Sequence, residues 1–381
     1  MIDSPAVARE KLRALAGTRS PEGEILSIAV STSRLDDYRQ SAPVYLHSEF
    51  SRLVKERGLA GDQRRRLQAG LDYVLDLLKY DLTPRTQGLA VFSDAGSGIS
   101  ERIELPLRLS NCLTVEPWAY IRPVAHALSL LEPFVLAEVS RDDSSLYVVD
   151  EWGVASENDL TGPWLRSSDR DTGEVSIKKY YADARRDNLV EHHHKEVASS
   201  LAKLLELSGA RRVILCAQHD IAAAFRRVLS SAANGAIAAE IPLDAGATVG
   251  QLVASARKAM EQARQEEMVA LVARVREGMG PGGHGVAGFD GTLEALGRGR
   301  LHTLLVDRGY RVPGWRCESC SWVGLTKPDR CPLCGASLVP MMDAVGELVR
   351  LTILEHGQVE VGEQVRGLEA LGGVAGLLRY A

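Results

Sequence analysis

The sequence predicts an α/β protein built from three domains, the last of them an α/β sandwich that carries an inserted zinc ribbon. The chain has 381 residues, which is enough for two or three hydrophobic cores. Stretches with helical periodicity alternate with strand-like apolar runs along most of this length. Two Cys-x-x-Cys pairs stand close together in the last quarter of the chain. We place the domains at 1–131, 132–264 and 265–381, with the ribbon at 315–336.

The first domain is expected to begin with a helix over Pro5–Ala16 and a strand over Ile25–Val30. Two helices follow, and the second has an apolar stripe at helical spacing, formed by Leu67, Leu71, Val74, Leu75 and Leu78. Three strand-like runs complete the domain: Gly88–Phe92, Glu101–Leu105 and Cys112–Val115. We interpret Gly96–Gly98 as a hairpin turn between the first two runs.

The second domain is expected to open with paired strands at Phe134–Val139 and Ser145–Val149. The polar stretch Thr161–Asn188, interrupted by glycine and proline, predicts a long loop. An α/β unit follows, in which a strand at Arg212–Cys216 and a short strand at Ala236–Ile241 alternate with helices.

In the third domain, a glycine-rich loop over Gly280–Gly285 precedes a helix at Thr292–Leu296 and a strand at His302–Val306. The ribbon comes next. A helix over Ala344–Glu355 and a strand over Gln358–Val361 lead to the glycine-rich C-terminal segment.

The clearest chemical signal is the set of four cysteines at Cys317, Cys320, Cys331 and Cys334. Two Cys-x-x-Cys knuckles separated by ten residues supply the four sulfurs of a tetrahedral zinc site. Because four thiolates fill the coordination shell, the zinc is expected to be structural. The alternative is a redox-active dithiol pair, which the matched second knuckle makes less favoured.

Composition is that of an ordinary globular protein, with 45% hydrophobic and 25% charged residues. The net charge of −5 excludes a global basic field, so nucleic-acid contacts would have to come from local patches. Cys112 and Cys216 lie in apolar runs and are expected to be buried thiols. The first residues lack the apolar core of a signal peptide, and no stretch is long and apolar enough to span a membrane. We therefore expect a cytoplasmic protein, and a monomer.

Two motifs suggest chemistry that their context does not support. His192–His194 cannot converge on one ion from a helix, because consecutive side chains point about 100° apart; we expect a partly exposed polar face instead. Gly280-x-Gly282-x-x-Gly285 follows a helix rather than a strand, unlike a dinucleotide fingerprint. No catalytic triad or carboxylate pair is apparent. Enzyme activity is therefore left uncertain, with the sequence leaning against it.

Basic residues cluster in two places. The polar stretch of the second domain carries Arg166, Arg170, Lys178, Lys179, Arg185 and Arg186, and a helix of the first domain starts with Arg64, Arg65 and Arg66. Both groups are candidates for RNA contact through phosphates. The alternative for each is an ordinary solvated surface, which is favoured for the three consecutive arginines.

Several segments together resemble the archaeo-eukaryotic peptide-chain release factor and Pelota superfamily, including its bacterial, Balon-like branch. Gly88–Phe92 is similar to the end of the family's N-terminal domain, and Gly288–Gly297 and His302–Val306 are similar to its C-terminal domain. Leu371–Tyr380 is similar to the closing glycine-rich Leu-Arg-Tyr signature. The resemblance implies a three-domain release-factor-like architecture with a ribosomal-protein-L7Ae-like C-terminal α/β sandwich. It also implies docking in the ribosomal A site, often after delivery by a translational GTPase.

The chain departs from the family in two kinds of segment: the loop that carries out peptide release and the motifs that decode stop codons. Release factors carry a Gly-Gly-Gln loop, whereas this chain has Val175-Ser176-Ile177 at the corresponding place and no glutamine between Gln87 and Gln218. Tyr45–Ser48 is the best match to the Asn-Ile-Lys-Ser decoding loop and differs at three of its four positions. Tyr120–His126 occupies the place of a Tyr-x-Cys-x-x-x-Phe motif and lacks its cysteine and phenylalanine.

These features lead to three hypotheses. The first is a ribosome-binding translation factor that occupies the A site without peptide-release chemistry, in hibernation or ribosome protection. The second is a ribosome-rescue enzyme that cleaves peptidyl-tRNA or its tRNA end. The third is an RNA-binding stress protein that acts outside translation on structured RNA.

Overall fold

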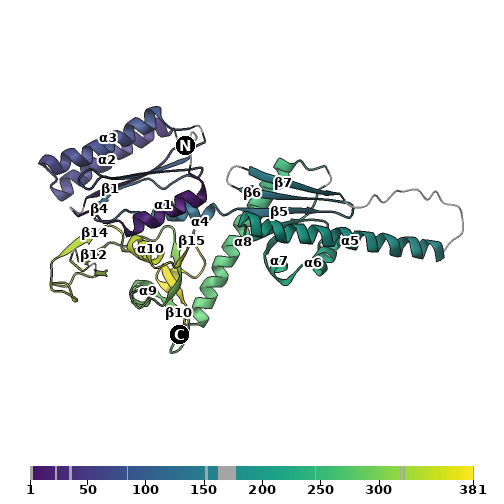
Figure 1. The fold of residues 1–381 in the computed structure, drawn as a ribbon. Helices are drawn as coiled ribbons and strands as arrows, with labels where there is room; N and C mark the ends of the chain where they lie inside the picture. Colours follow the sequence, from purple (N-terminus) through teal and green to yellow (C-terminus); the bar gives the residue numbers. More distant parts are fainter. Residues whose placement is uncertain are drawn as a thin grey trace. The chain divides into compact units, whose positions relative to one another are not determined.

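The computed structural model describes residues 3–21, 24–33, 37–83, 85–150, 153–161, 177–244, 246–317, 319–320 and 322–380; the side chains of 177–187 lie outside this description. The fold is α/β and divides into two compact units (Figure 1). One unit combines Met1–Leu130 with Glu267–Ala381, and the other is Leu131–Glu266. Among the described residues, no helix is long and apolar enough to cross a lipid bilayer.

The N-terminal part of the first unit is an antiparallel sheet with the order β3-β2-β1-β4. Its strands are β1 (Ile25–Ser31), β2 (Gly88–Asp94), β3 (Ile99–Leu105) and β4 (Cys112–Glu116). Helices α2 (Tyr38–Arg57) and α3 (Gly61–Tyr80) pack on one face of this sheet. The predicted stripe of α3 enters their shared core through Leu67, Leu71, Val74 and Leu78, with Leu75 at its edge. The predicted apolar stripe of α3, the predicted strands of this region and the hairpin turn between β2 and β3 are therefore confirmed.

Helices α1 (Pro5–Gly17) and α4 (Arg122–Leu130) pack against each other and against α10 (Ala344–Leu354) of the C-terminal part. Ser4 caps α1 through a hydrogen bond that its hydroxyl accepts from the N–H of Val7, and Pro5 occupies the first helical position, where no N–H is needed.

The C-terminal part of the first unit has a four-stranded sheet with the order β10-β16-β11-β15. Its elements are the C-terminal half of α8 (Val249–Glu277), β10 (Gly285–Ala287), α9 (Gly288–Gly297), β11 (Leu301–Asp307), α10 (Ala344–Leu354), β15 (Gln358–Gly362), the short helix η2 (Glu369–Leu371) and β16 (Val374–Leu378). Met268, Val272 and Val275 of α8 share a core with Leu305 and Ala375 of the sheet. This is the predicted α/β sandwich, and the glycine-rich stretch after α8 is a turn rather than a nucleotide loop.

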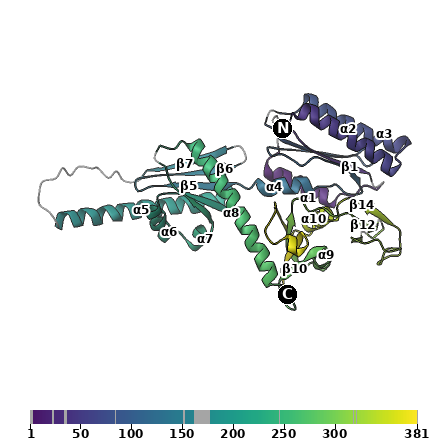
Figure 2. The ribbon, with the colours of Figure 1, turned by 180° about the vertical axis from the view of Figure 1, so that it is seen from behind.

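The second unit, whose strands β5, β6 and β7 are labelled in Figure 2, is built on a sheet. This sheet has five strands in the order β7-β6-β5-β8-β9, and β5, β8 and β9 run parallel. The strands are β5 (Phe134–Val139), β6 (Asp143–Asp150), β7 (Gly153–Thr161), β8 (Arg212–Cys216) and β9 (Ile237–Ile241), and the helices are α5 (Ile177–Ser208), α6 (His219–Val228) and α7 (Ser231–Gly235). Helices α5 and α6 contribute to the core on one face, and the first half of α8 contributes to the core on the other.

Three local expectations differ from the structure. Strand β7 was not predicted, because it is an exposed edge strand whose polar sequence does not alternate. Helix α5 starts at Ile177, so the second half of the predicted loop Thr161–Asn188 is helical, while 162–176 lies outside the described residues. Tyr45–Ser48, matched to a decoding loop, lies inside α2.

Candidate metal centre

A small three-stranded sheet is inserted between β11 and α10 and carries the four cysteines. Its strands are β12 (Gly314–Cys317), β13 (Val323–Gly324) and β14 (Leu338–Met341), in the order β13-β12-β14 with antiparallel pairing. Gly314 permits close packing at the base of this ribbon, because a Cβ atom there would lie 2.9 Å from both the Cβ of Ala344 and the carbonyl oxygen of Gly324.

The cysteines come from two tight turns that face each other. Cys317 ends β12, and Cys320 follows in the first turn. In the second turn, the N–H of Gly335 donates to the carbonyl of Cys331 at 2.9 Å, with Gly335 at a φ of +74°. That left-handed conformation favours glycine, which explains why glycine follows the second knuckle.

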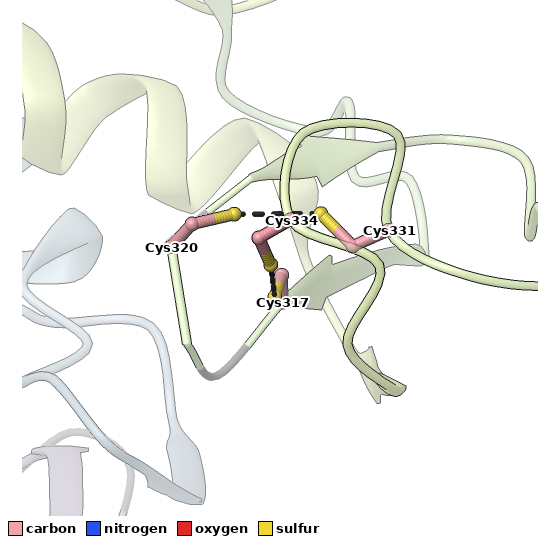
Figure 3. Close-up of side chains that lie close together, drawn as sticks. All are labelled: Cys317, Cys320, Cys331 and Cys334. Carbon is pink, nitrogen blue, oxygen red and sulfur yellow. Dashed lines mark hydrogen bonds between the residues drawn. The ribbon is translucent and has the colours of Figure 1, made fainter.

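The four sulfur atoms converge on one point (Figure 3). Cys317 Sγ lies 3.4 Å from Cys334 Sγ, and Cys320 Sγ lies 3.4 Å from Cys331 Sγ. All four sulfurs lie within 4.8 Å of one another. A tetrahedral ion with Zn–S bonds of ~2.3 Å would separate its sulfurs by about 3.8 Å. The donor set and its spacing therefore fit a closed four-thiolate metal site.

The backbone prepares the first cysteine of each knuckle for ionisation. The N–H of Cys320, followed by that of Ser319, lowers the pKa of Cys317 to about 6. For Cys331, burial opposes ionisation, but the N–H groups of Cys334 and Leu333 outweigh it and lower the pKa. Because the thiolate is the form that binds metal, the first cysteine of each turn is placed for coordination.

The ribbon is anchored to β4 by a buried ion pair. Arg316 Nη2 lies 2.6 Å from Glu116 Oε2, with exposed side-chain fractions of only 5% and 11%, and Arg57 approaches the other carboxylate oxygen at 3.0 Å. The guanidinium groups of Arg316 and Arg350 also lie 5.5 and 4.7 Å from the ring centre of Trp118. Such contacts stabilise an arginine held away from water.

A second buried network joins the N-terminal and C-terminal parts of the first unit. Asp343, the residue before α10, accepts hydrogen bonds from Tyr120 at 2.7 Å and from Arg122 at 2.5 Å. Arg122 also donates to the carbonyl oxygens of Asp307 and Tyr310. In the sequence, Tyr120–His126 shows only the lost motif, and this role of Tyr120 and Arg122 is not apparent. The available signal was a charged Arg122 within an otherwise apolar run, which indicates a buried, paired charge.

The RNA-contact candidates are only partly described. Arg65 pairs with Asp62 on the surface of α3, and Arg66 pairs with Glu24 at 3.0 Å, whereas Arg64 is exposed. Arg166 and Arg170 lie outside the described residues. Lys178, Lys179, Arg185 and Arg186 belong to α5, and their side chains also lie outside the description.

The histidine run differs from its expected exposure. His192 is exposed, but His193 and His194 are each 1% exposed on the sheet side of α5. His193 Nε2 lies 3.0 Å from the hydroxyl of Ser144, and His194 Nε2 lies 3.1 Å from the carbonyl oxygen of Ser140. These two histidines hold the β5–β6 turn against the helix, and among the described residues they form no metal cluster.

We expect this pair to make the second unit sensitive to acid. Burial, followed by mutual repulsion in the case of His193, lowers the pKa of both side chains. The ordinary pKa of histidine is about 6.5. As the pH falls below this value, the unfolded chain binds protons before the folded chain does. The free energy of unfolding therefore decreases, by at most about 1.4 kcal/mol for each histidine and each pH unit. Urea unfolding at a series of pH values measures this slope. The double variant His193→Gln with His194→Gln should reduce the slope of unfolding free energy against pH. The control His192→Gln, at an exposed position, should leave that slope unchanged. If the slope is unchanged in the double variant, His193 and His194 are not the source of the acid sensitivity.

Comparison with known proteins finds a family that part of the chain is similar to. Residues 120–267 match the model of bacterial archaeo-eukaryotic release factor family 10. No curated protein matches the chain.

Solved structures with similarity include the archaeal translation termination factor aRF1, at 16% identity over 100% of this chain and 99% of that one, with a TM-score of 0.27. Archaeoglobus fulgidus Pelota shows 16% identity over 77% and 80% of the two chains, with a TM-score of 0.32. S. cerevisiae Dom34, described as interacting with Hbs1, shows 11% identity over 77% and 79%, with a TM-score of 0.38. The similarity to bacterial archaeo-eukaryotic release factor family 10 therefore covers residues 120–267, which is less than half of the chain.

Proposed function

We propose that the protein is a release-factor-like translation factor that binds the ribosomal A site without peptide-release chemistry and so protects or silences the ribosome. The carrying observation is the match of residues 120–267 to a release-factor family in a chain that has no glutamine between Gln87 and Gln218. A hydrolysis mechanism that depends on Gly-Gly-Gln has no residue to perform it. Delivery by a translational GTPase and a cytoplasmic location belong to the same proposal.

The four-cysteine cluster is proposed to hold one structural zinc ion. Cys317, Cys320, Cys331 and Cys334 would fill all four coordination positions, so the ion would fix the two turns without binding water or substrate. The ribbon would then be a rigid projection rather than a reaction centre.

Ribosome binding through phosphates is expected to weaken steeply with salt. We expect the double variant Lys178→Glu with Lys179→Glu to reduce co-sedimentation with ribosomes. The negative slope of log affinity against log salt should also become shallower by about 1–2, because each lost phosphate contact removes roughly 0.7–0.9 from its magnitude. Pelleting through a sucrose cushion over a salt series measures both quantities. The matched control is Lys195→Glu with Lys203→Glu, which reverses two exposed charges on the same helix. Failure of the unmodified protein to pellet with ribosomes at low salt would contradict the proposal.

The same complexes distinguish the other two hypotheses. A factor without release chemistry should leave peptidyl-tRNA intact on stalled ribosomes after long incubation. Loss of the peptide or of the tRNA end would instead indicate a rescue enzyme. Crosslinking in cells that recovers mainly non-ribosomal RNA would indicate a role outside translation.

A further inference from the structure

The first unit contains a cavity that neither the metal cluster nor the proposed ribosome contacts use. It has a volume of about 280 Å³ and lies between α2, β4 and the first turn of α10. Its wall includes the aromatic residues Tyr45, Trp118 and Tyr120, together with Met341 and Met342. This volume is near the lower end of small-molecule sites, which are typically about 300–1,000 Å³ and mostly apolar, with a few polar groups.

The acidic side chains of the cavity wall all have arginine partners, and one further arginine, Arg311, lines the wall. Each acidic side chain of the wall has an arginine partner: Glu49 has Arg52, Glu116 has Arg316 and Arg57, Glu347 has Arg350, and Asp343 has Arg122. Arg311 also lines the cavity and is exposed. Across the part of the chain that the structure describes, its guanidinium has no ion pair or hydrogen bond.

The charge of Arg311 acts on the groups that surround it. Burial raises the pKa of Tyr45 to about 12 and that of Cys112 to about 11, and it also raises the pKa of Tyr120. In all three cases the positive charge of Arg311 opposes this rise. Arg311 lines the same cavity as Tyr45, Trp118 and Tyr120, so an anion bound to its guanidinium would meet an aromatic surface.

We propose that this cavity binds a small anion that carries an aromatic ring, the class of ligand that mononucleotides represent. Arg311 would hold the phosphate or carboxylate as a planar, multi-donor cation. The ring would lie among Tyr45 and the two methionines, since aromatic and thioether side chains make favourable contacts with flat rings. Trp118 is less available for stacking, because three guanidinium groups, those of Arg19, Arg316 and Arg350, lie within 5.5 Å of its ring centre. This site is independent of ribosome binding.

Isothermal titration of the full-length protein with AMP, GMP, CMP and UMP tests the proposal, with inorganic phosphate as the ring-free probe. We expect saturable binding of at least one nucleotide at micromolar to millimolar concentration, and much weaker binding of phosphate. Arg311→Ala should weaken the nucleotide by about tenfold to a hundredfold, the effect of losing a charge-assisted contact. Met342→Trp, at a half-exposed wall position, should block the site by filling it.

Arg298→Ala is the matched control, because it removes an exposed arginine that is paired with Glu294 and does not line the cavity. Circular dichroism establishes that each variant is folded. Absence of nucleotide binding to the unmodified protein would overturn the proposal. Equal affinity for phosphate and for nucleotides, or an equal loss in Arg298→Ala, would overturn it as well.

Discussion

Replacing Asp343 with alanine is expected to destabilise the first unit by about 3–5 kcal/mol, because it leaves a buried arginine without its counter-charge. Asp343 and Arg122 are only 5% and 6% exposed, and the carboxylate also accepts the Tyr120 hydroxyl. The remaining partners of Arg122 are neutral carbonyl oxygens. Urea unfolding measures the loss, and hydrogen–deuterium exchange locates it. We expect β4, α4 and α10 to lose protection while the second unit keeps its own.

Two further variants provide a scale for the loss of stability expected in Asp343→Ala. Tyr120→Phe removes one hydrogen bond and leaves the ion pair intact, so it should cost about 1 kcal/mol. Glu294→Ala removes a surface partner of Arg298, with both side chains at least 60% exposed, and should cost less than about 0.5 kcal/mol. The proposed order is Asp343→Ala, then Tyr120→Phe, then Glu294→Ala. If Asp343→Ala costs no more than Glu294→Ala, the buried network does not join the two parts.

Local sequence patterns were sufficient for most elements and for the four-cysteine cluster. The α3 stripe at Leu67, Leu71, Val74 and Leu78 repeats at helical spacing, so one buried face follows from periodicity alone. The cysteine knuckles are equally local. Two short turns fix where each pair of sulfurs points, and the spacer is too short to keep the turns apart.

The features that the sequence did not reveal depend on residues far apart in the chain or on surfaces without periodicity. Arg122 and Asp343 are separated by 221 residues, and neither carries a local sign of the other. Strand β7 is exposed and polar, so no apolar alternation marks it. His193 and His194 look polar in sequence, yet the turn between β5 and β6 supplies buried partners for both rings. In each case tertiary contacts decide the outcome.

One residue, Arg316, connects the ribbon to the contact between the N-terminal and C-terminal parts of the first unit. Arg316 lies next to Cys317 on β12 and pairs with Glu116 at the end of β4. Burial raises the pKa of Glu116, and the positive charges of Arg316 and Arg57 oppose that rise. The position of Arg316 therefore depends on β12, and β12 ends at Cys317 of the four-cysteine cluster. If the proposed zinc ion is lost, the effect is expected to reach the contact between the N-terminal and C-terminal parts of the first unit through Arg316.

Removing the metal is expected to unfold the ribbon. Its strands contain four, two and four residues, which is too little structure for an independent core. In small zinc-binding domains the metal supplies about 10–16 kcal/mol of apparent binding free energy, most of which becomes folding free energy. We expect one zinc ion per chain by elemental mass spectrometry. After chelation, exchange protection should disappear over 314–341 and decrease in β4, while the sheet that contains β11 and β16 should remain protected.

Single substitutions separate the metal from the thiols themselves. Cys331→Ser removes one ligand and should reduce the zinc content and the protection of the ribbon together, because three ligands leave the shell open. Cys216→Ala is the matched control: this thiol is fully buried in the second unit, its pKa is raised to about 12 by burial, and it lies outside the cluster. It should keep a full zinc complement even if its own unit is destabilised. A zinc content well below one per chain in the unmodified protein, or a ribbon that stays protected after chelation, would show that the four sulfurs converge without a metal holding them.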